Sequence, residues 1–101
     1  MKSVSATRLD NVVLVGSRKA VARYVAAILY KFFVEKRDRI EVRALGNAIS
    51  RAVHAATGAC MLARELCIEN VSIGTVRFVY EGRTRYVSRI VIEIVNRDRI
   101  A

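Results

Sequence analysis

The sequence predicts one α+β domain, a two-layer β-α-β-α-β-β sandwich with two helices on one face of a mixed four-stranded sheet and a long C-terminal β-hairpin arm. Three observations support this. The 101 residues suit one domain, and 53% of them are apolar, enough for a core. Helix-like and strand-like periodicities alternate along the chain. The last two strand-like runs flank a Glu-Gly dipeptide, which indicates a hairpin.

The first half of the chain alternates between strand and helix. Residues 11–16, "NVVLVG", are a β-branched apolar run that ends in glycine, which predicts a buried strand. Over residues 20–36 the apolar residues recur at helical spacing. They are Val21, Val25, Ile28, Leu29 and Phe32. Residues 40–44 alternate apolar and polar side chains, so we expect a half-exposed strand, parallel to the first and reached by a right-handed crossover.

A second helix is predicted from Asn47 to about Cys67. Its apolar stripe consists of Ile49, Val53, Ala56, Cys60 and Ala63. Cys60 and Cys67 would then lie about 10 Å apart on one helix face, too far for a disulfide, so we expect two buried free thiols. Residues 71–80 and 84–95 follow as the antiparallel hairpin.

These elements define the domain boundaries. We expect a flexible basic lead-in over residues 1–10, one domain over 11–97 and a polar tail over 98–101. The N-terminus lacks a signal-peptide pattern, and no apolar run is long enough to cross a membrane. We therefore expect a cytoplasmic protein that makes no membrane contact.

The net charge of this chain is unusually positive. Lys and Arg number 18 against 9 Asp and Glu, which gives a net charge of +9, and the pI is about 10.4. Of the basic residues, 14 are Arg, whose planar guanidinium suits phosphate. A polyanionic partner is the favoured interpretation. The alternatives are a charge that serves solubility or a thermophilic composition.

One basic cluster, "GSRKAVAR" at residues 16–23, joins the first strand to the first helix. Arg18 and Lys19 lie near the helix start, and Arg23 follows one turn later. Basic residues there cost about 0.3–1 kcal/mol against the helix dipole, whereas the same positive end binds phosphate well. This favours phosphate contact over the alternative of solvated side chains.

The second cluster is the hairpin "RFVYEGRTRYVSR", residues 77–89. It sets four arginines against one acid: Arg77, Arg83, Arg85 and Arg89 against Glu81. A two-residue turn would pair Tyr80 with Arg83 and Phe78 with Arg85, placing all four side chains on one face. A three-residue turn would change these pairs.

The hairpin tip is expected to project from the domain. About ten residues before the turn reach roughly 33 Å, close to the width of a domain of this size. A basic two-stranded ribbon of this kind can enter a DNA groove. The alternative is a solvated or dimer-packed hairpin.

Catalytic and metal-binding patterns are lacking. There is no Ser-His-acid or Cys-His set and no phosphate loop, and one histidine, His54, with two distant thiols does not make a metal site. We expect no enzyme activity, no metal and no cofactor.

Three motifs together resemble the Alba family, small basic chromatin proteins of archaea. They are "NVVLVG" with its basic loop and "YVAAIL", then "ALGNAISRAV", then "EGRTRYVSRIVIEIV", and the resemblance covers nearly all of residues 11–97. It implies a homodimer that binds double-stranded DNA, and RNA, without sequence specificity. It also implies that the loop and second helix contact the backbone while the hairpins reach into the minor groove.

The resemblance carries specific residues with it. The family's loop lysine pair falls on Arg18 and Lys19, its helix lysine on Arg51, its strand residue on Arg43 and its hairpin arginine on Arg83. The full predicted DNA- and RNA-binding set is Arg18, Lys19, Arg23, Arg43, Asn47, Arg51, Arg77, Arg83 and Arg85.

This chain also departs from the family pattern. Leu45 and Asn47 stand where members often have Arg, which shifts weight to Arg43, Arg51 and the arms. The acetylated family lysine aligns with Arg18, which leaves Lys19 as the candidate modification site. Met61 and Leu62 replace an aromatic residue used between dimers and are the candidate dimer–dimer contact. The chain therefore resembles a divergent, second-paralogue-like member.

Three functions follow as hypotheses. The first is an architectural, chromosome-associated protein that coats or compacts duplex DNA. The second is an RNA-binding protein of a ribonucleoprotein, with Phe78 and Tyr80 as a stacking platform. The third is a heterodimer partner of another family member.

Overall fold

The computed structural model describes residues 9–100, so most of the predicted lead-in lies outside the described residues. The elements are β1 (Val12–Leu14), α1 (Val21–Phe33), β2 (Arg39–Leu45), α2 (Ile49–Leu62), β3 (Leu66–Tyr80), β4 (Arg83–Asn96) and the single-turn α3 (Arg97–Ile100). Short 3-10 turns, Leu9–Asn11 and Gly46–Ala48, precede β1 and α2. This element order confirms the predicted β-α-β-α-β-β succession.

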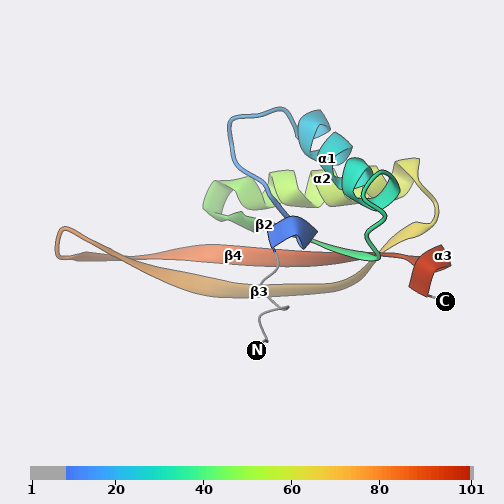
Figure 1. The fold of residues 1–101 in the computed structure, drawn as a ribbon. Helices are drawn as coiled ribbons and strands as arrows, with labels where there is room; N and C mark the ends of the chain where they lie inside the picture. The colour runs from blue at the N-terminus through green and yellow to red at the C-terminus, as the bar shows by residue number, and fades with distance from the viewer. Residues whose placement is uncertain (1–8, 101) are drawn as a thin grey trace.

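The four strands form one mixed sheet with the order β1-β2-β4-β3. β1 and β2 are parallel, whereas β4 is antiparallel to both β2 and β3. Helices α1 and α2 lie together on one face of this sheet (Figure 1). The predicted two-layer α+β architecture is confirmed, and the other face of the sheet, which these two helices leave uncovered, is called the open face below.

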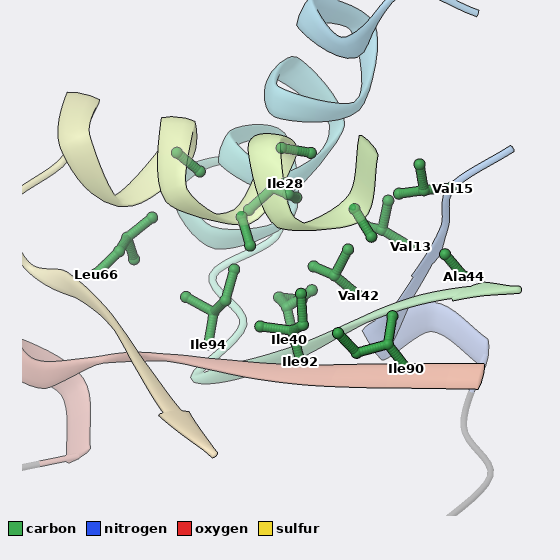
Figure 2. Packing of buried hydrophobic residues seen from close by; sticks show 14 of the residues in the cluster. Val13, Val15, Ile28, Ile40, Val42, Ala44, Leu66, Ile90, Ile92 and Ile94 are labelled. Atoms are coloured by element: carbon green, nitrogen blue, oxygen red, sulfur yellow. The ribbon is translucent and has the colours of Figure 1, made fainter. Parts of the chain in front are cut away.

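The core lies between the sheet and the helices. Alternate residues of β2 and β4 supply its floor, and Figure 2 shows Ile40, Val42, Ile90, Ile92 and Ile94 gathered beneath the helices. The fully buried side chains of α2 are all small, which brings its backbone close to the strands. They are Ala52, Ala55, Ala56 and Ala59, all buried. α1 adds Ile28 and Phe32, both fully buried.

The predicted extent of the second helix was wrong. α2 ends at Leu62, where the chain becomes extended at Ala63, and Cys67 belongs to β3 rather than to the helix. Pairing of Leu66 with Asn96 extends β3 to this point, so sheet formation overrides the helical periodicity. Both thiols are free, but they are half-buried rather than fully buried as expected. Burial, and the nearby Cys67 thiol, raise the pKa of the Cys60 thiol.

The hairpin turn contains two residues, Glu81 and Gly82, both with positive φ, of 50° and 74°. Positive φ at both central positions is the geometry of a type I′ turn, whose twist matches that of the strands. Tyr80 pairs with Arg83 and Phe78 with Arg85, so the two-residue alternative is the one adopted.

The end of the hairpin stands clear of the rest of the sheet. Leu45 pairs with Arg89, which is the last contact between β2 and β4. Beyond it Thr75–Tyr80 and Arg83–Ser88 pair only with each other; we call this segment the arm. Six residues extend roughly 20 Å, and the molecule measures 48 × 36 × 20 Å. The arm projects away from the helices, as predicted (Figure 1).

Candidate nucleic-acid interface

Most ion pairs gather near the beginning of β2. Arg37 lies 3.0 Å from Asp10, and Lys31 lies 3.7 Å from Glu35. Arg39 pairs with Glu69, whose hydrogen bond and charge raise the pKa of the guanidinium. These acids leave little unbalanced positive charge at this end of the molecule.

The opposite end of β2 is different, because the ends of two parallel strands meet there. β1 leads into the loop at residues 16–20, and β2 leads into the turn at Gly46–Ala48. We call these two segments, with the first turns of α1 and α2, the loop edge. Arg18, Lys19, Arg23 and Asn47 are exposed on it. Among the described residues, no ion pair involves the three basic side chains.

Both helices begin at the loop edge without a neutralising group. Ala20 precedes α1 and Ala48 precedes α2; neither has a side chain that can accept a hydrogen bond from the first N–H groups of the helix, and neither helix has an acid in its first turn. The free N–H groups and the positive dipole ends therefore add to the basic side chains. This arrangement favours an anion.

The loop at residues 16–20 is held in place at both of its ends. The Gly16 N–H donates to the Tyr24 hydroxyl at 3.1 Å. Nε of Arg51 donates to the Gly16 carbonyl at 2.9 Å, and its Nη2 donates to the Lys19 carbonyl. The guanidinium of Arg51 is thus occupied by the loop backbone, which places Arg18 and Lys19 at a fixed position.

Arg43 has a partner as well. It is half-buried on the open face, and its Nε donates to Glu41 at 2.8 Å. Its charge is therefore shared with a carboxylate on the same strand. Of the predicted binding residues, Arg43 and Arg51 are the two whose guanidinium groups are already engaged.

The arm carries its predicted patch on one face. Phe78, Tyr80, Arg83 and Arg85 line a shallow hollow near the tip together with Glu81. Arg77 pairs with Tyr86 and lies on the opposite face, because neighbouring residues of a strand alternate. In the described part of the chain, no ion pair involves Arg77, Arg83 or Arg85.

One arginine at this interface was absent from the predicted set. Arg89, at the base of the arm, lines a hollow at the loop edge with Gly16, Asn47 and Arg43. The sequence indicated Arg89 as a candidate, because it is the fourth arginine of the hairpin run. The periodicity could not show that Arg89 of β4 lies next to the end of β2.

The predicted dimer–dimer contact lies apart from this interface, whereas the predicted modification site lies on the loop edge. Met61 and Leu62 are exposed at the end of α2, where they line an apolar groove with Val25 and Leu29 of α1. Lys19 is exposed and stays a predicted modification site. Neither the dimer–dimer contact nor the modification is tested by the structure.

A separate apolar strip follows β3 on the helix side of the sheet. Ile68, Val71 and Ile73 pair with the core residues of β4, yet α2 leaves them exposed, Ile73 by 78%. Val53 of α2 was predicted as core but is 38% exposed. It lies on the side of α2 away from Gly58, which faces α1. Val53 therefore lies on the side of α2 that faces away from α1.

Other kinds of site find little support. Within residues 9–100, no three His, Cys, Asp or Glu side chains gather as metal ligands. We therefore assign no residue to a metal or cofactor. No described helix has the length and apolar character needed to span a membrane.

Comparisons with known proteins find a similarity to Alba proteins. The Alba family model matches residues 11–58. Alba from Thermoplasma volcanium superposes with a TM-score of 0.76 at 27% identity, covering 84% of this chain and 99% of that one. The chain is therefore similar to Alba proteins in both sequence and fold. This confirms the resemblance inferred from the three motifs.

Two other Alba proteins extend the comparison. The DNA/RNA-binding protein Alba of Methanococcus maripaludis is 47% identical over 45 residues, which are 45% of this chain and 49% of that protein. The match thus spans about half of the relative's length. ALBA1 of Trypanosoma brucei superposes with a TM-score of 0.70 at 21% identity, covering 91% of this chain and 76% of that chain, and shares the fold.

Proposed function

We propose that this protein binds double-stranded DNA as a dimer, without sequence specificity, and that it coats or compacts the DNA as a chromosome-associated protein. RNA is a second ligand. The observation that carries the proposal is the distribution of charge: the arm and the loop edge hold basic side chains without acidic partners. A relative named as DNA/RNA-binding supports the same ligand class.

The binding mechanism is charge neutralisation by two structurally distinct parts. Arg18 and Lys19, held beside two uncapped helix N-termini, contact phosphates over the body. Arg83 and Arg85 enter the minor groove, where the negative potential attracts guanidinium without identifying a base. Each phosphate neutralised releases counterions, so affinity falls steeply with salt.

The strip of Ile68, Val71, Ile73 and Val53 supports the dimer. β3 is the edge strand of the sheet, and an exposed apolar edge is an association surface. A second copy would bury the strip and present two arms to one duplex. Ile73→Arg should give a monomer in light scattering, whereas Leu14→Arg, on the other face of the sheet, should stay dimeric.

The proposal on DNA is tested by titrating several unrelated 30-base-pair duplexes across a range of salt concentrations. Comparable affinities are expected, with a slope of log K against log salt near −0.9 for each phosphate neutralised. A duplex that binds a hundredfold more tightly than the others would contradict the architectural function.

The hollow between Phe78, Tyr80, Arg83 and Arg85 favours a second candidate function, binding of unpaired RNA. Aromatic side chains stack on bases with about 1–3 kcal/mol each. On this alternative, Tyr80→Ala should weaken single-stranded RNA binding about tenfold and leave duplex DNA binding nearly unchanged. Equal losses on the two ligands would leave duplex DNA as the favoured target.

A further inference from the structure

Arg89 occupies a position that only glycine in the facing strand permits. It pairs with Gly74 of β3, and its guanidinium lies directly over that residue. A Cβ placed on Gly74 would come 2.3 Å from Nη2 of Arg89 and 3.1 Å from Cζ, well inside contact distance. Gly74 therefore provides the space in which the half-buried guanidinium lies.

The charge of Arg89 is available for a ligand. Among the described residues, its side chain takes part in no hydrogen bond or ion pair. Arg43, which lies on the same open face, donates to Glu41 instead. A half-buried cation without a partner is costly, and a bound anion would offset this cost.

Arg89 also lies in line with the arginines of the arm. Arg83, Arg85 and Arg89 occupy alternate positions of β4, so all three side chains emerge from the same face. The row extends roughly 20 Å from the tip of the arm. At its inner end Arg89 borders the same hollow as Gly16, Ser17 and Asn47 of the loop edge.

From this geometry we infer that Arg89 is a phosphate-binding residue that joins the arm and the loop edge into one continuous track, and that Gly74 sets its position. The inference rests on the proposed function. It adds a contact at the base of the arm, where the nucleic-acid backbone passes from the groove-inserted tip to the body of the protein.

The test compares Arg89→Ala, Gly74→Ala and the double variant on one duplex by fluorescence anisotropy across salt concentrations. Arg89→Ala should bind about tenfold more weakly, with a salt slope smaller by about 0.9 per Arg89–phosphate contact. Gly74→Ala displaces the guanidinium but keeps its charge, so affinity should fall severalfold. In the Arg89→Ala background, Gly74→Ala should have no further effect.

Arg64→Ala is the matched control, because it removes one positive charge beyond α2, at the end of the molecule opposite the arm (Figure 1). If Arg89→Ala behaves like Arg64→Ala, the inference is overturned while duplex binding by the wild type still stands. If the wild type itself does not bind duplexes, the proposed function fails and the inference fails with it. A loss of thermal stability in Arg89→Ala without a change in salt slope would assign Arg89 to packing alone and overturn the inference.

Discussion

The arm and the loop edge present the same kind of charge by different means. The loop edge is tied to the body, since Arg51 and Tyr24 hold its backbone and two helices support it from behind. The arm is held mainly by its own two strands and its turn, and only at its base does Val87 lie beside Gly46 of the loop edge. On the proposed function, the loop edge is a fixed platform, whereas the arm can adjust to the groove that it would enter.

The largest effect is expected from removing the two arginines at the tip of the arm. Arg83→Ala with Arg85→Ala should weaken duplex binding about a hundredfold and reduce the salt slope by about 1.8 per arm engaged. Anisotropy titrations would measure both quantities. Arg64→Ala with Arg99→Ala removes the same amount of charge at the far end of the molecule. An equal loss of affinity in that variant would mean that the arm arginines act only through the net charge.

A smaller loss is expected at the loop edge. Arg18→Ala with Lys19→Ala should weaken binding about tenfold, because these exposed side chains meet phosphates in a solvated, screened setting. The same titrations apply. A loss larger than that of the arm pair would reverse the comparison and make the platform the dominant contact.

Substitution of Arg51 tests whether phosphate binding by the loop edge depends on the hydrogen bonds that hold its backbone. Arg51→Ala removes two hydrogen bonds to the loop carbonyls, which should lower the free energy of unfolding by about 1–3 kcal/mol and weaken binding by less than the arm pair does. A double-mutant cycle separates the roles of Arg51. In the Arg18→Ala, Lys19→Ala background the binding loss should disappear, whereas a loss that persists would identify a direct phosphate contact.

The smallest effect is expected at the turn. Gly82 has φ of 74° and no neighbour that a Cβ would meet within 4 Å, so Gly82→Ala costs only backbone strain, about 1 kcal/mol. Hydrogen exchange in the arm should accelerate while the unfolding midpoint stays the same. Glu81→Asn, which suits positive φ, is the control. A lowered midpoint would mean that the arm is coupled to the core.

The order of elements could be predicted because it depends on local periodicity and turn chemistry. The hairpin and the helix-1 core positions followed from turn chemistry and spacing, whereas the choice between a two-residue and a three-residue turn stayed open until the structure showed the two-residue turn. The end of α2 could not be predicted, since its helical pattern continues to Cys67 while strand pairing with Asn96 determines the structure.

The contacts of the interface were less accessible from sequence. The engagement of Arg51 with carbonyls more than 30 residues away depends on tertiary structure, and so does the position of Arg89 over Gly74. Sequence indicates which residues are basic. Only the fold shows which of them are already neutralised.

The concentration of acids near the start of β2 has a kinetic consequence. Arg37, Arg39 and Lys31 are balanced by carboxylates there, so the unbalanced positive charge of the molecule lies toward the arm and the loop edge. In the field of a polyanion this asymmetry orients the approaching protein before contact. Most encounters then begin with the arm and the loop edge toward the polyanion.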